Sequence, residues 1–171
     1  VTFTYVLAHN ILYTYISPFL LPAGLAADID QVLLVFGLAA LMGIWIVGLL
    51  IDRLLPALLV ISCALFAAAA LALGLWTAST EVIYLSVAIW GLAFGGLPAL
   101  LQTALAKSAG DSADAAQSML VTVWNLGIAG GGLLGGVLLQ GWGVMSFPWV
   151  VAGLAMLALI ATLQTRSAKL M

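Results

Sequence analysis

Long apolar stretches separated by a few charged positions dominate the sequence. The charge-free runs cover residues 1–27, 31–51, 54–80, 82–106 and 115–165. A helix that rises about 1.5 Å per residue needs ~20 residues to cross the ~30 Å hydrocarbon core of a bilayer. Each of the first four runs therefore fits one helical span, and the fifth is long enough for two spans and a turn. Because the runs are apolar on all faces, they are typical of helices inside a membrane.

The pattern predicts six transmembrane helices. A turn signal, Gln-Gly-Trp-Gly at residues 140–143 followed by Pro148, divides the longest run. The predicted spans are 3–23, 31–51, 55–76, 82–105, 115–139 and 146–165. We therefore expect an all-α membrane protein, folded over residues 1–171 as a single six-helix bundle, with a cytoplasmic loop at 106–114.

The basic residues predict how the bundle is oriented. Arg53 follows the second predicted span, Lys107 the fourth, and Arg166 and Lys169 the sixth. Since basic residues concentrate in cytoplasmic loops, both ends of this segment are expected in the cytoplasm, with the protein in the inner cell membrane. The first span begins at once after Val1, without an initiator Met, so we expect a longer protein with a further segment upstream.

Composition narrows the class of protein. Hydrophobic residues make up 65% of the chain and charged residues 6%, whereas a soluble domain carries about 25% charged residues. So few charges could not cover a water-soluble surface, and a net charge of −2 offers no basic patch for nucleic acid. One cysteine and one histidine provide neither a disulfide nor a metal cluster, so no metal and no other cofactor is expected.

The six predicted spans divide into two triplets, and the first span of each triplet carries helix-breaking residues. The first span contains Pro18 and Pro22, and the fourth contains Gly95, Gly96 and Pro98. Proline removes a backbone N–H and kinks a helix. Broken segments at corresponding positions of two repeats indicate the binding region of a transporter. The alternative is that proline and glycine are simply more frequent in membrane helices.

Glycines at four-residue spacing predict close packing between helices, because small residues at this spacing let two backbones approach. The predicted packing glycines are Gly91, Gly95, Gly127, Gly131 and Gly135. We expect static close packing from this pattern. The alternative is a smooth face that slides during transport.

Polar and aromatic side chains within the spans predict a cavity. Together they would form an uncharged, partly aromatic wall that suits a neutral or amphipathic organic solute. The predicted cavity residues are Asn10, Tyr13, Ser17, Trp90, Gln102, Trp124 and Asn125. For each residue taken alone, the alternative is an interhelical hydrogen bond. His9 could titrate near neutral pH and couple protons, but we expect a neutral, hydrogen-bonded histidine.

The second span closes with Gly-Leu-Leu-Ile-Asp-Arg at residues 48–53. The carboxylate of Asp52 at a helix end can accept N–H groups from the N-terminus of another helix. Arg53 can pair across a loop or bind a lipid phosphate. The alternative is an ordinary solvated turn, but the Gly-x-x-x-Asp-Arg spacing is a specific signal.

Four stretches, in order, resemble helices of the C-terminal half of a major facilitator superfamily transporter. They are residues 14–20 (Thr-Tyr-Ile-Ser-Pro-Phe-Leu), 36–53 (Phe-Gly through Ile-Asp-Arg), 90–103 (Trp-Gly through Gln-Thr) and 125–136 (Asn-Leu-Gly-Ile-Ala-Gly through Leu-Gly-Gly). They look like the seventh, eighth, tenth and eleventh helices of the bacterial drug:proton antiporter branch, near the arabinose and sugar efflux permeases.

The resemblance implies half of a twelve-helix fold that works by alternating access. It implies proton-coupled efflux of a small neutral or amphipathic solute such as a drug, sugar or nucleoside. Gly48, Asp52 and Arg53 would then form a cytoplasmic gate. The partners implied are the lipid bilayer, an N-terminal six-helix half, the solute and protons. Since no charged residue lies within a predicted span, proton coupling is expected in the N-terminal half.

Two other functions are alternatives to transport by half of a transporter. A channel or packing subunit could act as a homodimer of six-helix units that encloses a path by two-fold symmetry. An intramembrane serine protease needs a reactive serine in a glycine-flanked loop together with a histidine. His9 has no such Gly-x-Ser-Gly partner in the sequence, so an enzyme is not expected.

Overall fold

The computed structural model describes residues 1–168, with side chains for residues 1–165, and all regular structure in that range is helical. The α-helices are α1 (Thr2–Thr14), α2 (Ile16–Leu20), α3 (Ile29–Leu75), α4 (Thr80–Gly95), α5 (Leu97–Ala109), α6 (Ala113–Gly141) and α7 (Phe147–Ala168). Short 3-10 turns connect them: η1 (Leu21–Ala23), η2 (Ala26–Asp28), η3 (Gly110–Ser112) and η4 (Val144–Ser146).

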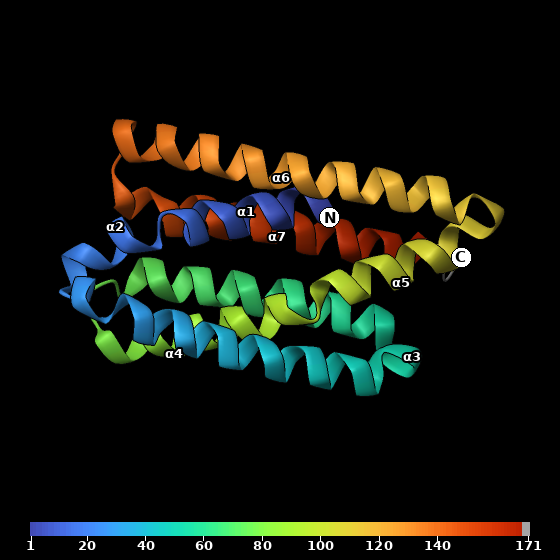
Figure 1. The fold of residues 1–171 in the computed structure, drawn as a ribbon, viewed down its shortest axis with the longest axis horizontal. Helices are drawn as coiled ribbons and strands as arrows, with labels where there is room; N and C mark the ends of the chain where they lie inside the picture. The colour runs from blue at the N-terminus through green and yellow to red at the C-terminus, as the bar shows by residue number, and fades with distance from the viewer. Residues whose placement is uncertain (169–171) are drawn as a thin grey trace.

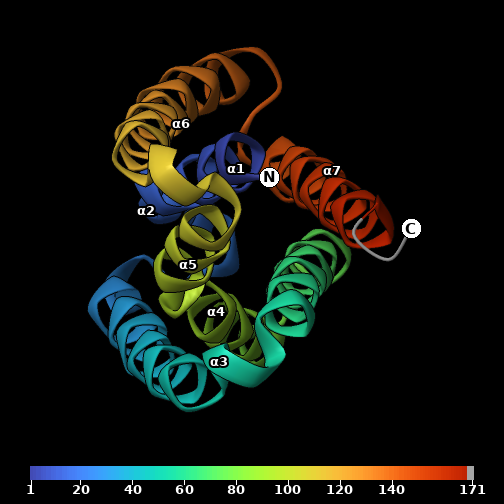
Figure 2. The same cartoon turned by 90° about the vertical axis from the view of Figure 1, so that its right-hand side faces the viewer.

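The helices run along one common long axis, and α3 contributes two of the rods (Figure 1). Its backbone leaves helical geometry at Leu54, where φ is −122° and ψ is 16°. The chain reverses there, so that α3 consists of a first arm, residues 29–53, and a second arm, residues 55–75. Seen along the axis, α6, α1, α5 and the first arm of α3 lie toward one side, and α7 and the second arm lie toward the other (Figure 2).

Three breaks in the helices lie shortly before a proline. The breaks are at Tyr15, Leu54 and Gly96, and the prolines that follow them are Pro18, Pro56 and Pro98. A proline cannot donate to the carbonyl four residues earlier, and its ring clashes with that carbonyl. The helix therefore gives way between the proline and that carbonyl, which confirms the expected interruptions of the first and fourth predicted spans.

Three stretches of consecutive helices among the described residues are long and apolar enough to cross a membrane. They are Ala26–Leu75, Thr80–Gly141 and Val144–Thr165. This number is lower than the six predicted spans for two reasons. The first two stretches each contain two predicted spans, because the chain stays helical through a reversal, and the first predicted span is not among the three, because α1 ends at Thr14 after 13 residues. The first stretch folds back at Leu54, and the second turns through η3, where Gly110 takes a φ of 51°.

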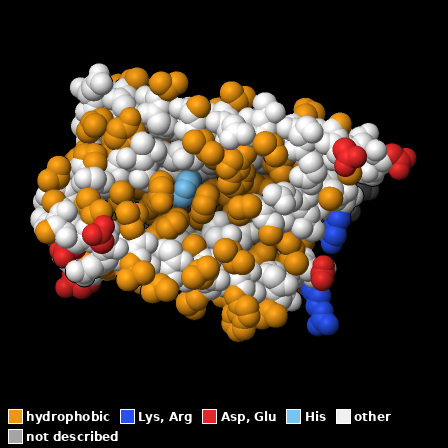
Figure 3. All heavy atoms as spheres, viewed as in Figure 1, with side chains coloured by type: hydrophobic (Ala, Val, Ile, Leu, Met, Phe, Trp, Pro, Cys, Tyr) orange, Lys and Arg blue, Asp and Glu red, His pale blue; other side chains and the backbone are white. Residues whose placement is uncertain are grey.

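The charged side chains lie at the two ends of the molecule and the long flanks are apolar (Figure 3). Large hydrophobic side chains point outward from several helices, among them Leu41, Trp45, Leu85, Leu133 and Leu157. An apolar surface of this extent is far larger than the patches that a monomeric soluble protein exposes. Lipid can cover such flanks without penalty, because apolar side chains have no favourable hydration to lose.

Glycines bring α4 against the first arm of α3. A Cβ placed on Gly91 would collide with the backbone carbonyl of Phe36, and one placed on Gly95 would collide with that of Ala40. The two backbones are therefore so close that a side chain larger than hydrogen cannot fit between them.

Glycines bring α6 against α1 in the same way. A Cβ on Gly127 would lie 2.9 Å from Cβ of Val6, and a Cβ on Gly131 would lie 2.5 Å from Cβ of Asn10. One turn further, a Cβ on Gly135 would overlap the ring of a tyrosine at the α1–α2 break. All five predicted packing glycines thus face a neighbouring helix at close range.

Candidate functional site

His9 lies near the middle of the bundle, with three other rings around it. Its imidazole stacks on Phe94 of α4, with ring centroids 3.6 Å apart and the planes at 6°. Tyr13, one turn later on α1, stacks at 5.2 Å and 20°. Because two rings cannot share one face at these distances, Phe94 and Tyr13 cover opposite faces of the imidazole. The indole N–H of Trp90 donates a 3.1 Å hydrogen bond to His9 Nδ1.

Two further rings extend this group onto α3 and α6. The ring of Phe36, on the first arm of α3, lies 4.6 Å from that of Trp90 and 5.7 Å from that of Tyr13. Trp124 of α6 lies 6.2 Å from Phe94. We call this group the aromatic cluster; it consists of His9, Tyr13, Phe36, Trp90, Phe94 and Trp124. It joins four helices that are far apart in the sequence, and none of its members carries a fixed charge.

Three of the predicted cavity residues belong to the aromatic cluster. Trp90 is fully buried, whereas Tyr13 is 44% exposed and Trp124 is half-buried. Tyr13 and Trp124 can therefore contact a solute, whereas the buried Trp90 supports His9 through its hydrogen bond. The predicted neutral, hydrogen-bonded state of His9 fits this arrangement, because the indole N–H of Trp90 needs an acceptor.

The two predicted asparagines satisfy their amides on their own helices. Asn10 donates a 2.8 Å hydrogen bond to the carbonyl of Val6, and Asn125 donates a 3.0 Å bond to that of Val121. Asn10 also packs against Gly131. Each amide retains a carbonyl oxygen as an acceptor, and Asn125 is exposed beside Trp124 on α6.

The structure does not bring Gln102 and Ser17 to the aromatic cluster. Gln102 is exposed on α5, and its backbone carbonyl accepts a 3.2 Å hydrogen bond from the amide of Gln117 on α6. Ser17 is exposed on α2, beyond the break at Tyr15.

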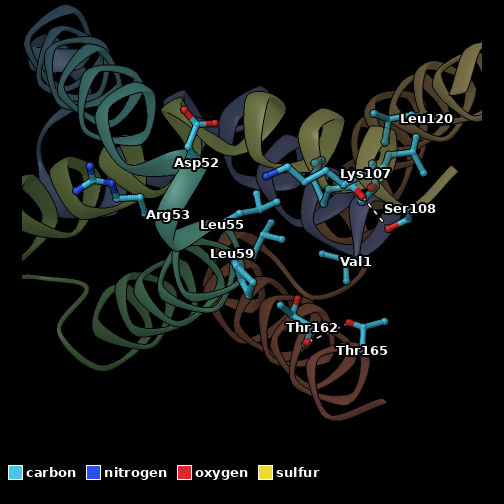
Figure 4. Close-up of a pocket in the computed structure, with 15 residues that line it drawn as sticks. Val1, Asp52, Arg53, Leu55, Leu59, Lys107, Ser108, Leu120, Thr162 and Thr165 are labelled. Carbon is cyan, nitrogen blue, oxygen red and sulfur yellow. Dashed lines mark hydrogen bonds between the residues drawn. The ribbon is translucent and has the colours of Figure 1, made fainter. Parts of the chain in front are cut away.

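The predicted gate residues lie at the end of the bundle where α3 reverses. A pocket of about 530 Å³ opens there, and Asp52, Arg53 and Lys107 are among the residues that line it. Figure 4 shows Asp52 and Arg53 on the turn of α3, with Lys107 across from them on α5. The rest of the lining is mostly apolar or hydroxyl-bearing and comes from the start of the chain and from α3, α5, α6 and α7. Gly48, one turn before Asp52, is exposed and has no neighbour within 4 Å of a Cβ built on it.

Sequence reasoning missed Phe36 and Phe94, and it did not place His9 in the site. A phenylalanine within a long apolar run gives the same signal whether it fills a core or lines a cavity. Only the packing of α4 on α3, which Gly91 and Gly95 permit, shows that these rings converge.

Comparison with known proteins identifies the family. Residues 1–169 match the Major Facilitator Superfamily. The chain belongs to the Major Facilitator Superfamily. It is therefore part of a membrane transporter and not an enzyme, and the resemblance found in the sequence is confirmed at the level of the superfamily.

The superfamily members most similar in sequence include efflux proteins. The chain is 30% identical over 156 residues to the probable sugar efflux transporter of Mannheimia succiniciproducens, covering 90% of this chain and 39% of the relative. It is 34% identical over 162 residues to the purine ribonucleoside efflux pump NepI of Escherichia coli K12, covering 92% and 40%. The probable sugar efflux transporter of Helicobacter pylori J99 is 29% identical over 153 residues, covering 88% and 39%. The chain thus spans about two fifths of the length of these curated relatives.

Proposed function

We propose that this chain is the C-terminal six-helix half of an efflux transporter that exports a small neutral or amphipathic solute by alternating access. The observation that carries the proposal is the aromatic cluster, which joins α1, α3, α4 and α6 and contains no fixed charge. A site built from rings and a few hydrogen-bonding groups binds uncharged organic solutes.

The proposed number of spans follows from the two reversals of the chain. The fold at Leu54 makes two rods of α3, and the turn at η3 separates α4 and α5 from α6. Together with α1–α2 and α7, this gives six rods, each of about the length that crosses a bilayer. They would form a single bundle over residues 1–171, with the second repeat starting at α4. A further six helices would complete the twelve-helix fold.

The charges support a cytoplasmic location for the end of the bundle where α3 reverses. Within the described side chains, Arg53 and Lys107 are the basic residues, and both line the pocket at that end. Figure 3 shows blue side chains at one end of the molecule and red ones at both ends. By the positive-inside rule, that end faces the cytoplasm of a cell whose inner membrane holds the protein. The side chain of Arg166 and all of Lys169 lie outside the described residues.

The solute is proposed to be a sugar, a nucleoside or a hydrophobic drug. The relatives are named for sugar and purine ribonucleoside efflux, and both kinds of solute are uncharged and rich in hydrogen-bonding groups. Asn125 and the hydroxyl of the exposed residue Tyr13 would meet such groups. We place proton coupling in the N-terminal half, because the acidic side chains drawn in Figure 3 lie at the ends of the bundle, away from the aromatic cluster.

Transport into inside-out membrane vesicles tests this function. Vesicles from cells that express the complete gene product would be energised to an acidic interior and given radiolabelled arabinose, inosine or the uncharged drug chloramphenicol in turn. We expect at least one solute to accumulate above its external concentration and to be released when an ionophore collapses the pH gradient. Vesicles that carry a Trp124→Ala, Tyr13→Ala double variant serve as the control and should accumulate less.

Two results would count against the proposal. Accumulation of none of the three solutes by protein that is present and folded in the membrane would contradict efflux. Equilibration without accumulation, at the same rate with and without the gradient, would instead support the homodimeric channel.

A further inference from the structure

The imidazole of His9 is covered on both faces and on one edge. Phe94 and Tyr13 stack on its faces, and the indole N–H of Trp90 occupies Nδ1. Only the edge that carries Nε2 is left. His9 is 6% exposed, so this ring is more than nine-tenths buried and touches the surface at a small area.

The exposed part of His9 includes Nε2. Among the described residues, no hydrogen-bond partner is found for this nitrogen, and no buried side-chain nitrogen or oxygen is left without a partner. A nitrogen with no partner that is not buried must reach the surface. In Figure 3 the histidine is visible on the face shown, with apolar side chains on both sides of it and the charged groups far away at the ends.

The hydrogen bond from Trp90 fixes which ring nitrogen of His9 carries the proton. An indole N–H only donates, so Nδ1 must accept and cannot hold a proton. A neutral imidazole then carries its proton on Nε2. His9 therefore presents a single N–H donor, in a fixed position, to the face between α1, α3, α4 and α6.

Rings flank this donor on two sides. Tyr13 lies on one face of His9, and Phe94 lies on the other with Trp124 6.2 Å beyond it. Phe36 lies at an edge of the imidazole, 5.9 Å from His9 and 5.7 Å from Tyr13. Tyr13 is exposed, and Phe36 and Trp124 are half-buried, so their outer faces can stack on a flat molecule. A planar solute held in this way would direct its edge, and not its face, toward the N–H of His9.

We propose that His9 Nε2–H is a specificity-determining hydrogen-bond donor that selects a planar heteroaromatic solute with an acceptor atom on the edge of its ring, and that Trp90 is the positioning residue that keeps this donor in place. The inference rests on the proposed efflux function and narrows its solute class. A saturated sugar offers hydroxyls but no flat ring to stack, and a plain hydrocarbon ring offers no acceptor. A nucleoside with a carbonyl or aza nitrogen on its base has both features.

Two probes that share the ribose and a flat bicyclic ring, but differ in the polar atoms on the edge of that ring, test the proposal. Inosine and 1-ribosylindole have the same ribose and a flat bicyclic ring, but the indole has no acceptor on its edge. Binding would be measured on the purified complete protein in detergent, with tritiated inosine and with ribosylindole as competitor. The quantity compared between variants is the ratio of the two dissociation constants.

The variants separate the donor from the rings around it. His9→Phe keeps a stacked ring and removes the N–H, and it should reduce the preference for inosine by about fivefold, the value of one hydrogen bond. Trp90→Phe keeps the imidazole but removes the donor that fixes its tautomer. The preference for inosine should therefore fall, but by less than in His9→Phe. Phe36→Leu should weaken both probes alike. Trp142→Phe, an exposed indole at the end of α6, is the control and should change neither constant.

Each outcome decides a different point. An unchanged ratio in His9→Phe, with inosine still bound and exported, would overturn the role of His9 and leave efflux intact. Export of arabinose with no binding of either ribosyl probe would overturn the solute class and leave efflux intact, whereas no transport of any solute would contradict the proposed function itself. Should His9→Phe not fold, Trp90→Phe carries the test: an unchanged ratio there, with inosine bound, overturns the proposal.

Discussion

The phenol of Tyr15 donates a 2.8 Å hydrogen bond to the backbone carbonyl of Gly132 in α6. Tyr15 is the residue at which α1 ends and α2 begins. Its ring lies against Gly135 and Gly136, where a Cβ would come within 2.9 Å of it. The break between α1 and α2 is therefore fixed against α6. Tyr15 fits there only because the facing residues of α6 are glycines, which have no Cβ.

Replacing Tyr15 by Phe should lower the free energy of unfolding by about 0.6 kcal/mol, the average for an interhelical hydrogen bond in a membrane protein. The ring keeps its place against the glycines, so the loss comes from the hydroxyl alone. Unfolding by sodium dodecyl sulfate in bicelles measures it. Tyr13→Phe is the matched control, because Tyr13 lies on the same rod with 44% of its side chain exposed, and it should change the stability little. Equal losses in both variants would contradict this explanation.

The breaks themselves could be predicted from the sequence, although their positions could not. Pro18 and Pro98 identified the two interrupted rods, and the structure has breaks in both. The backbone departs from the helix at Tyr15 and at Gly96, before each proline. The affected carbonyl lies four residues earlier, and which intervening residue gives way depends on what the neighbouring helices can accept. Glycines on α6 receive Tyr15, a contact between residues more than a hundred positions apart.

The candidate site was predictable only in part, for a similar reason. Tyr13, Trp90 and Trp124 stand out as polar aromatics in apolar runs, and the structure brings them into one cluster. Phe36 and Phe94 have no polar atom in their side chains and so do not stand out in the sequence. How deeply each residue is buried also depends on packing. Trp90 has no exposed surface, although its indole is chemically as suited to a cavity wall as the indole of Trp124.

Two adjacent glycines of α6 should respond in opposite ways to the same substitution. Gly131→Ala would place a Cβ 2.5 Å from Cβ of Asn10 and 2.9 Å from the carbonyl of Leu7, and overpacking of this kind costs about 1–3 kcal/mol. Gly132 has no atom within 4 Å of its Cβ position, so Gly132→Ala should leave the stability unchanged or raise it by up to about 1 kcal/mol through helix propensity. Thermal unfolding in dodecyl maltoside compares the two. A stable Gly131→Ala would show that α1 and α6 can separate without cost.

A buried hydroxyl relay links α1, the second arm of α3 and α4. Ser62 Oγ donates a 2.7 Å hydrogen bond to the carbonyl of Ala93. Its single proton is then used, so the 3.2 Å contact between Ser62 Oγ and the Tyr5 hydroxyl has Tyr5 as the donor.

Ser62→Ala should cost about 1–2 kcal/mol, because it removes both bonds and leaves the Tyr5 hydroxyl with only the weaker 3.4 Å contact to the backbone carbonyl of residue 62. Tyr5→Phe removes the two longer contacts of the phenol but keeps the 2.7 Å bond from Ser62 to Ala93, so it should cost less. In the double variant the two losses should not add, since they share one interaction. Additive losses, measured by the same detergent unfolding, would show that the two hydroxyls act independently.

The proposed gate makes a prediction about transport and not about stability. Asp52 is exposed at the fold of α3 and lines the end pocket together with Arg53 and Lys107, so its carboxylate is available to N–H groups of another helix when the cytoplasmic side closes. Asp52→Asn keeps the size of the side chain and removes its charge. A charge-assisted hydrogen bond contributes about 1.5–3 kcal/mol, so efflux by the complete gene product should fall by about tenfold or more, with unchanged thermal unfolding.

Asp30→Asn is the matched control for this experiment. Asp30 is an exposed aspartate at the opposite end of the first arm of α3, and its loss should leave efflux near the wild-type rate. If both variants export normally, the turn at Asp52 is an ordinary solvated one and the gate must lie elsewhere. If both fail equally while remaining folded, charge at either end of the arm matters and no specific latch at Asp52 is needed to explain the effect.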